Sequence, residues 1–292
     1  MKHIFQGTGV AVVTPFQQNG AIDKPAISRL VEHLVVGKID YMVVLGSTGE
    51  AATLSDAEKE EVIACFLEAN QGRLPIVLGA GGNDTRAVAE TVATYQKYPV
   101  QGILSASPHY NKPSQEGIYR HYKAISEVSE KPIILYNVPG RTASNMLADT
   151  TLRIAHDCKN VVAMKEASAN LEQMAQIMAG RPEGFALLSG DDPLVLPVIS
   201  LGGEGIISVL AQAKPLLFST MVREALAGDF AAARPKHYEL IKLTQFAFAE
   251  GNPAGIKLIL NELGICAPWV RLPLVEGSEK LRAEIRKELA GK

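Results

Sequence analysis

A lysine at the end of an apolar run is the first residue with the means to do chemistry. In the stretch VVAMKEAS, residues 161–168, Lys165 follows four apolar residues. A buried ammonium without a partner is costly, so a lysine in such a place pairs with a carboxylate, reaches solvent or gives up its proton. Taken alone, Lys165 is more often a structural residue, paired with Glu166 or pointing at solvent.

Other polar residues stand at the ends of similar apolar runs. They occur in GSTGE (46–50), SPHYNKPS (107–114), YNVPGRT (136–142) and SGDD (189–192). A neutral amine is a nucleophile for carbonyl carbon, and the Schiff base that forms is an electron sink for the adjacent carbon–carbon bond. This chemistry needs a second group that moves protons. Tyr136 is the candidate relay, and Ser47 or Thr48 could orient it or hold a substrate carboxylate.

Each of these residues also has a purely structural interpretation. Tyr136 alone is equally well explained as an aromatic at a barrel rim, hydrogen-bonded to the backbone. The glycines of GSTGE could simply supply positive φ in a strand-to-helix turn. Arg141 could form a surface salt bridge, and Tyr110 could be a loop or interface aromatic.

The composition is that of a soluble globular protein and argues against some partners. The 292 residues are 47% hydrophobic and 21% charged, with a formal net charge of −2. No basic excess favours nucleic acid or an anionic membrane. We find neither a signal peptide nor an apolar run of about 18 residues that could span a bilayer. Cys65, Cys158 and Cys266 are far apart and odd in number, which indicates reduced thiols and a cytoplasmic location.

Short apolar runs typical of strands alternate with longer amphipathic segments over most of the chain. The runs are apolar throughout, as in parallel strands buried on both faces. The eight expected strands are residues 9–15, 41–46, 75–81, 102–107, 132–139, 161–167, 185–192 and 205–209. Helix patterns begin near Pro25, Ser55, Asp84, Ser114, Asp149 and Asn170. Ser55 and Glu58 have the spacing of a capping box.

This alternation of strands and helices predicts an α/β protein, a closed (β/α)8 TIM barrel that forms a catalytic domain over residues 1–228. After Gly228 only helical patterns remain, so residues 229–292 are predicted to form a C-terminal helical region, packed against the barrel or a neighbouring subunit. The active site of such a barrel gathers at the C-terminal ends of its strands. The polar segments above should therefore meet at one mouth, and this favours a catalytic Lys165.

Other kinds of site have less support. GAGGND (79–84) lacks the third glycine of a dinucleotide fingerprint, since Asp84 takes its place. The six histidines show no pair at helix-face spacing, so no metal site is expected. Asp191 and Asp192 precede Pro193, which favours a helix start with an acidic cap over a cation site. We expect neither a metal nor a cofactor.

The motifs together resemble the 4-hydroxy-tetrahydrodipicolinate synthase (dihydrodipicolinate synthase) family of class I, lysine-dependent aldolases. The likeness runs from about residue 7 to residue 275 and rests on GSTGEAATLS, SPHYNKPSQEGIYRHYKAI, YNVPGRT, MKEAS, LLSGDD and GIISV in this order. The resemblance implies condensation of pyruvate with L-aspartate 4-semialdehyde, the entry step of the diaminopimelate route to lysine. It also implies a homotetramer, a dimer of dimers, that works without metal or cofactor.

The family's functional residues map onto this chain. The resemblance implies that Lys165 forms the Schiff base with pyruvate and that Tyr136 is the main proton relay. Tyr136 would be linked through Thr48 to Tyr110, which in this family is lent by the neighbouring subunit of a tight dimer.

The substrate-binding residues are implied in the same way. Arg141 would hold the carboxylate of the semialdehyde by a fork-like contact, and Ile207 would offer a backbone carbonyl near pyruvate. Ser47 stands where the family usually has a threonine, so it keeps the hydroxyl and loses a methyl group. The serine also occurs in N-acetylneuraminate lyases. A pyruvate-dependent sugar-acid lyase, of the N-acetylneuraminate or 2-keto-3-deoxygluconate type, is the alternative function, against which Arg141 argues because it suits a short aldehyde that bears a carboxylate. A non-catalytic barrel is a third.

Feedback inhibition by lysine is the last property that the resemblance raises. Some members bind lysine at the dimer interface through histidine, tyrosine and acidic contacts. This chain has Lys59 and His109 in place of the first two and Ala87 in place of the acidic residue. Repulsion by Lys59 and loss of the carboxylate predict weak or absent inhibition.

Overall fold

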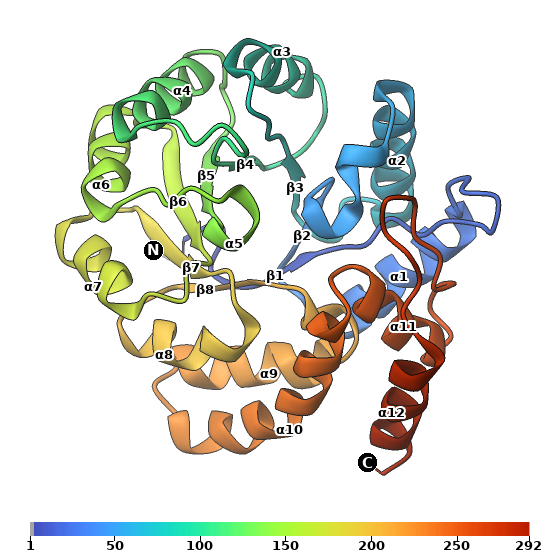
Figure 1. The fold of residues 1–292 in the computed structure, drawn as a ribbon. Helices are drawn as coiled ribbons and strands as arrows, with labels where there is room; N and C mark the ends of the chain where they lie inside the picture. The colour runs from blue at the N-terminus through green and yellow to red at the C-terminus, as the bar shows by residue number, and fades with distance from the viewer. Residues whose placement is uncertain (1–2, 292) are drawn as a thin grey trace. The chain divides into compact units, whose positions relative to one another are not determined.

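The structure is a computed structural model that describes residues 3–291. Its eight parallel strands form one closed barrel in chain order, which confirms the predicted fold (Figure 1). The strands are β1 (Gly7–Ala11), β2 (Tyr41–Val44), β3 (Ile76–Gly79), β4 (Gly102–Ala106), β5 (Ile133–Asn137), β6 (Val161–Glu166), β7 (Ala186–Ser189) and β8 (Gly205–Ser208). Nearly every strand residue is buried, as the uninterrupted apolar runs predicted.

Helices follow the strands, and further helices form the C-terminal part of the chain. They are α1 (Lys24–Val36), α2 (Asp56–Asn70), α3 (Thr85–Tyr95), α4 (Gln115–Glu127), α5 (Pro139–Thr142), α6 (Ala148–Asp157), α7 (Leu171–Gly180), α8 (Val195–Ser200), α9 (Pro215–Leu226), α10 (Phe230–Ala249), α11 (Ala254–Glu262) and α12 (Glu279–Ala290). All six predicted helix starts are confirmed to within one residue. None of the helices within residues 3–291 is long and apolar enough to cross a membrane.

The capping box at the start of α2 is confirmed. The hydroxyl of Ser55 accepts a hydrogen bond from the backbone N–H of Glu58 (3.3 Å), and the Glu58 carboxylate accepts one from the backbone N–H of Ser55 (2.9 Å). These bonds satisfy two backbone donors that the first turn of a helix leaves without partners. The helix begins at a fixed place after the GSTGE segment.

Strand ends differ from the sequence prediction where an apolar run continues past the sheet. The first strand was expected over residues 9–15, but β1 ends at Ala11. Val12 and Val13 stay buried, and the backbone N–H of Val13 donates to the side chain of Gln212 instead of a neighbouring strand. The seventh run ends early too, because a 3-10 turn begins at Asp192.

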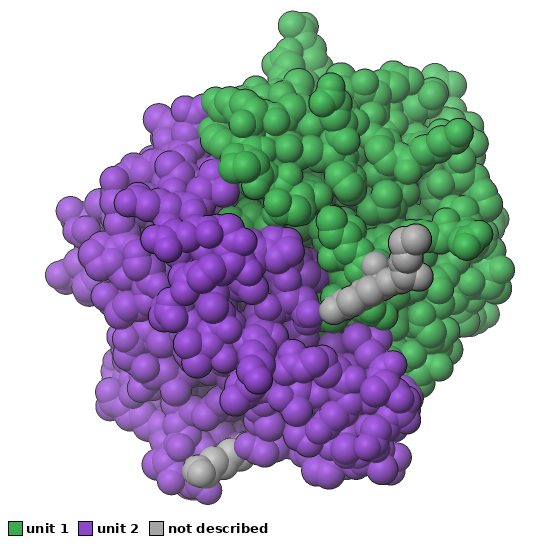
Figure 2. All heavy atoms as spheres, turned by 180° about the vertical axis from the view of Figure 1, so that it is seen from behind, with its two compact units in different colours: residues 1–7, 76–207 green, residues 8–75, 208–292 purple. Residues whose placement is uncertain are grey.

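The chain divides into two compact units (Figure 2). One comprises residues 1–7 and 76–207, and the other comprises residues 8–75 and 208–292. Within the second unit α10, α11 and α12 pack against one another, and α10 also packs on α9. The domain boundary expected near residue 228 stays a prediction.

Candidate active site

Lys165 and Tyr136 lie side by side on neighbouring strands. They are register partners in the parallel pairing of β5 with β6. The Nζ atom of Lys165 lies 4.2 Å from the centre of the Tyr136 ring. Both side chains are buried, with 4% and 7% exposure. An aromatic face attracts an ammonium, so the ring helps to hold the lysine side chain in place.

The neighbouring pair on the same strands, Asn137 and Glu166, forms a separate polar network. The Glu166 carboxylate accepts hydrogen bonds from the Asn137 amide (3.0 and 3.1 Å), the Gln173 amide (3.0 Å) and the backbone N–H of Ser168 (2.8 Å). Burial raises the pKa of Glu166, and these donors oppose the rise. Successive strand residues point to opposite faces, so Glu166 is held by these donors and does not pair with Lys165.

Asp191 is the acidic group whose electrostatics Lys165 affects. Burial raises the pKa of Asp191, and the charge of Lys165 lowers it in part. The predicted helix start is confirmed, since a 3-10 turn begins at Asp192 with Asp191 at its N-cap position, but the Asp191 side chain makes no capping hydrogen bond. Its carboxylate belongs to the electrostatic surroundings of the lysine.

Arg141 and Tyr110 lie on two adjoining segments. Arg141 is an exposed residue of the short helix α5, which the sequence analysis did not predict. The backbone N–H of Tyr110 donates to the carbonyl of Thr142 at 3.3 Å, so the loop that carries Tyr110 runs beside α5. Tyr110 has a positive φ of 70° and a side chain that is 84% exposed.

Ile207 lies in β8 and is fully buried. It is placed by the sheet, and its side chain is part of the apolar core. The predicted contact of its carbonyl with pyruvate stays a prediction.

Ser47 and Thr48 form a 3-10 turn, Ser47–Gly49, after β2. Ser47 is exposed, whereas Thr48 is buried with 3% exposure. The Thr48 hydroxyl accepts a hydrogen bond of 2.9 Å from the amide of Asn252. Asn252 was missed by the sequence analysis, because 204 residues separate it from Thr48 and no local pattern marks it.

A β/α barrel that buries a lysine at the end of β6, against a tyrosine of β5, has the architecture of a class I aldolase, a lyase that works through a Schiff base. The match to known families is specific. The chain belongs to the dihydrodipicolinate synthetase family, whose model matches residues 4–292. The family predicted from the sequence is confirmed.

Individual relatives agree with this assignment. The chain is 49% identical to a 4-hydroxy-tetrahydrodipicolinate synthase of Flavobacterium psychrophilum, over 95% of this chain and 94% of the relative. It is 48% identical to one of Parabacteroides distasonis, over 96% of each. Among solved structures, dihydrodipicolinate synthase from Aquifex aeolicus has a TM-score of 0.95 at 38% identity, covering 98% of both chains. The Thermotoga maritima protein gives 0.96 at 38% identity, over 99% of both.

Proposed function

We propose that this enzyme condenses pyruvate with L-aspartate 4-semialdehyde through a Schiff base on Lys165. The predicted activity, that of a 4-hydroxy-tetrahydrodipicolinate synthase, is confirmed over a sugar-acid lyase by relatives of that name at 42% to 49% identity. One observation above all supports Lys165 as the nucleophile. It is a buried amine at the end of a barrel strand, set against Tyr136, while Glu166 is held by other donors.

In the proposed reaction the Lys165 amine has a different role at each stage. The neutral Nζ adds to C2 of pyruvate, and water leaves to give the iminium. Loss of a proton from C3 gives an enamine, which attacks the aldehyde carbon and forms the new carbon–carbon bond. The amino group of the semialdehyde then displaces Lys165 from C2 and closes the ring, so the lysine is regenerated, and the only water released over the whole reaction is the one that left when the iminium formed.

Three hydroxyl groups are proposed to move the protons that these stages require. Tyr136 is the principal relay, because its ring lies against the reacting amine. Thr48 and Tyr110 are the further members of the relay. The 84% exposure of Tyr110 in a single chain supports the view that it acts in the site of a second subunit.

Three further residues are proposed to hold the substrates. Arg141 binds the carboxylate of the semialdehyde, for which a planar guanidinium offers two parallel hydrogen bonds. Ser47 binds the carboxylate of pyruvate together with Thr48, and Ile207 presents its carbonyl to the same molecule. No metal or cofactor takes part in this proposal.

The assembly is proposed to be a homotetramer, a dimer of dimers, in which the exposed Tyr110 is covered by a partner subunit. We place the enzyme in the cytoplasm. Cys65, Cys158 and Cys266 are free, as is usual in a reducing compartment.

Trapping the Schiff base tests the nucleophile directly. Protein incubated with pyruvate is reduced with borohydride, digested and mapped by mass spectrometry, with Lys165→Arg and the exposed Lys159→Arg as a matched pair. We expect the pyruvate adduct on the Lys165 peptide of the wild type and of Lys159→Arg, and none in Lys165→Arg. An adduct on another lysine, or its persistence in Lys165→Arg, would contradict the proposal.

The acceptor is tested by pyruvate consumption with three aldehydes. L-aspartate 4-semialdehyde should support rapid loss of pyruvate, whereas N-acetylmannosamine and glyceraldehyde should not. Preference for either sugar-derived aldehyde would leave Lys165 as the nucleophile and overturn the assigned acceptor.

A further inference from the structure

We propose that Asn252 is a positioning residue that sets the direction of the Thr48 hydroxyl hydrogen. The proposal rests on the proposed function, because it matters only if that hydroxyl takes part in the reaction. All of the residues that carry it lie in the compact unit of residues 8–75 and 208–292.

The hydrogen bond between the two side chains has a defined polarity. Asn252 donates its amide N–H to the Thr48 oxygen at 2.9 Å, and the two residues are only 9% and 3% exposed. A hydroxyl has one hydrogen and two lone pairs. Since the amide occupies one lone pair, the hydrogen of Thr48 cannot point toward Asn252 and must donate in another direction. Asn252 therefore fixes Thr48 as a donor toward its next partner.

Asn252 can exert this control because its helix is attached to the same turn at a second point. It stands just before α11, where Lys257 is fully buried. The Lys257 ammonium donates to the Glu50 carboxylate at 2.6 Å and to the carbonyl of Trp269 at 2.8 Å. Glu50 lies two residues after Thr48. The turn and the start of α11 are thus joined by two bonds, one to Thr48 and one to Glu50.

Glu50 itself is held in an unusual backbone conformation. Its φ is 54°, a left-handed value that costs energy for a residue with a side chain. Its second carboxylate oxygen accepts a hydrogen bond of 2.9 Å from the backbone N–H of Arg271. Two bonds from the C-terminal part of the chain therefore stabilise the conformation that ends the Ser47–Gly49 turn.

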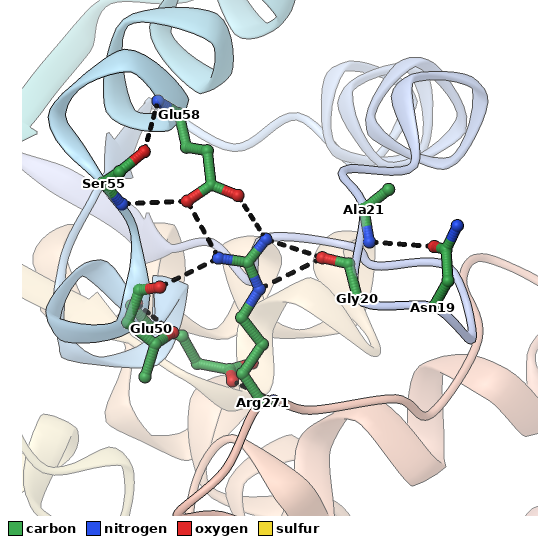
Figure 3. A network of polar contacts seen from close by, with 8 residues as sticks. Asn19, Gly20, Ala21, Glu50, Ser55, Glu58 and Arg271 are labelled. Atoms are coloured by element: carbon green, nitrogen blue, oxygen red, sulfur yellow. Dashed lines mark hydrogen bonds and ion pairs between the residues drawn. The ribbon is translucent and has the colours of Figure 1, made fainter.

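Arg271 extends the attachment to the segment that follows. Figure 3 shows its guanidinium between the carboxylate of Glu58 and the carbonyl of Gly20. It donates two bonds to Glu58 (2.6 and 3.0 Å), two to Gly20 (2.6 and 3.1 Å) and one to the carbonyl of Thr53 (2.8 Å). The guanidinium of Arg271 and the ammonium of Lys257 both lie over the ring of Phe16. The segment that follows Thr48 is therefore attached at Glu50, Thr53 and Glu58, and these bonds fix the position of the turn beside the Asn252 amide.

A double-mutant cycle distinguishes positioning through Thr48 from a general structural role. The variants are Thr48→Val, Asn252→Ala and the double variant, each measured for kcat, for the KM of pyruvate and for thermal unfolding. We expect Thr48→Val to lower kcat by about 100-fold and Asn252→Ala by roughly 10- to 100-fold, with little change in KM. In the Thr48→Val background, removing Asn252 should have almost no further effect.

Two isosteric substitutions separate the loss of the amide donor from a loss of folding. Asn252→Asp preserves the shape and replaces the donor by an acceptor, so the Thr48 hydrogen turns toward it. We expect kcat at least as low as in Asn252→Ala. Asn261→Asp makes the same change later in α11, where the amide donates to the carbonyl of Cys266, and should leave kcat near that of the wild type. Borohydride trapping of pyruvate on Lys165 should persist in both and shows that the site has folded.

Failure of the inference and failure of the proposed function give different results. If Asn252→Ala lowers kcat equally in the presence and absence of the Thr48 hydroxyl, or if Asn252→Asp keeps the wild-type kcat, the inference is overturned while Thr48 keeps its role. If Thr48→Val keeps the wild-type kcat, the proposed relay through Thr48 is wrong, and the inference falls with it.

Discussion

Lys165 and Tyr136 face each other across β5 and β6, with the amine nitrogen 4.2 Å from the centre of the phenol ring. The ring and the hydroxyl of Tyr136 have separable tasks in this geometry. The ring packs against the lysine, and the hydroxyl is proposed to move protons.

Removing the hydroxyl alone should therefore slow the reaction without displacing the lysine. We expect Tyr136→Phe to lower kcat by about 100- to 1,000-fold, the range of general acid–base catalysis. Steady-state kinetics checks this, with Tyr119→Phe as the control. Tyr119 donates to the carboxylate of Asp157 at 2.9 Å, so the loss of its hydroxyl should reduce stability by about 1 kcal/mol and spare kcat. A Tyr136→Phe variant with the wild-type kcat would exclude the relay.

Arg141 should affect the second substrate and not the first. In Arg141→Gln the guanidinium that binds the semialdehyde carboxylate is lost, and we expect the KM for the semialdehyde to rise by roughly 10- to 100-fold. The yield of trapped pyruvate adduct should be unchanged. Equal losses with both substrates would mean that Arg141 supports the loop and does not bind the acceptor.

Because Lys257 and Glu50 are both buried, removing one partner of this ion pair should lower the stability of the protein strongly. Lys257→Met leaves the Glu50 carboxylate without its ammonium partner, and we expect a loss of about 3 to 5 kcal/mol in the free energy of unfolding. Adding Glu50→Gln should restore part of this, because the remaining buried group is then neutral. Urea unfolding of the single and the double variant measures both changes in the free energy of unfolding. A double variant less stable than Lys257→Met would contradict this account.

His121 should make the protein sensitive to mild acid. Burial lowers the pKa of its imidazole from 6.5 to about 4, and Thr85 lies 2.9 Å from its Nδ1. Because the folded-state pKa is depressed, its contribution to stability is complete above pH 6.5 and is lost as the pH falls toward 4. We expect His121→Gln to reduce the slope of unfolding free energy against pH in this window by up to about 1.4 kcal/mol per unit. An unchanged slope would show that His121 is not the responsible group.

Inhibition by lysine should be weak or absent. Lys59 carries a positive charge and lies 2.9 Å from Asp56, and Ala87 offers no carboxylate to an incoming ammonium. We expect the rate with both substrates to be nearly unchanged at millimolar lysine. Half-inhibition by sub-millimolar lysine would refute this prediction.

Local sequence patterns predicted the barrel well because each strand is a buried apolar run and six of the helices begin at a recognisable start signal. Strand ends were less predictable, since Val12 and Val13 remain apolar after the sheet has ended. The closeness of Lys165 and Tyr136 could be predicted because the topology of a barrel brings the ends of neighbouring strands together. Asn252 could not, since its partner Thr48 lies 204 residues earlier and the pairing depends on how α11 docks. The electrostatics of Asp191 could not be predicted either, because they depend first on burial and then on Lys165, which belongs to another strand.

The attachment of the Ser47–Glu50 turn also has a consequence during protein synthesis. Glu50 leaves the ribosome long before its partner Lys257, which is 207 residues further along the chain. At roughly 5 to 20 residues per second, this interval is on the order of 10 to 40 seconds. During that time the nascent chain carries the Ser47–Glu50 turn without the bonds from Asn252, Lys257 and Arg271. The Ser47–Glu50 turn can therefore acquire all of these bonds only after translation of the last part of the chain, however early the barrel strands begin to pair.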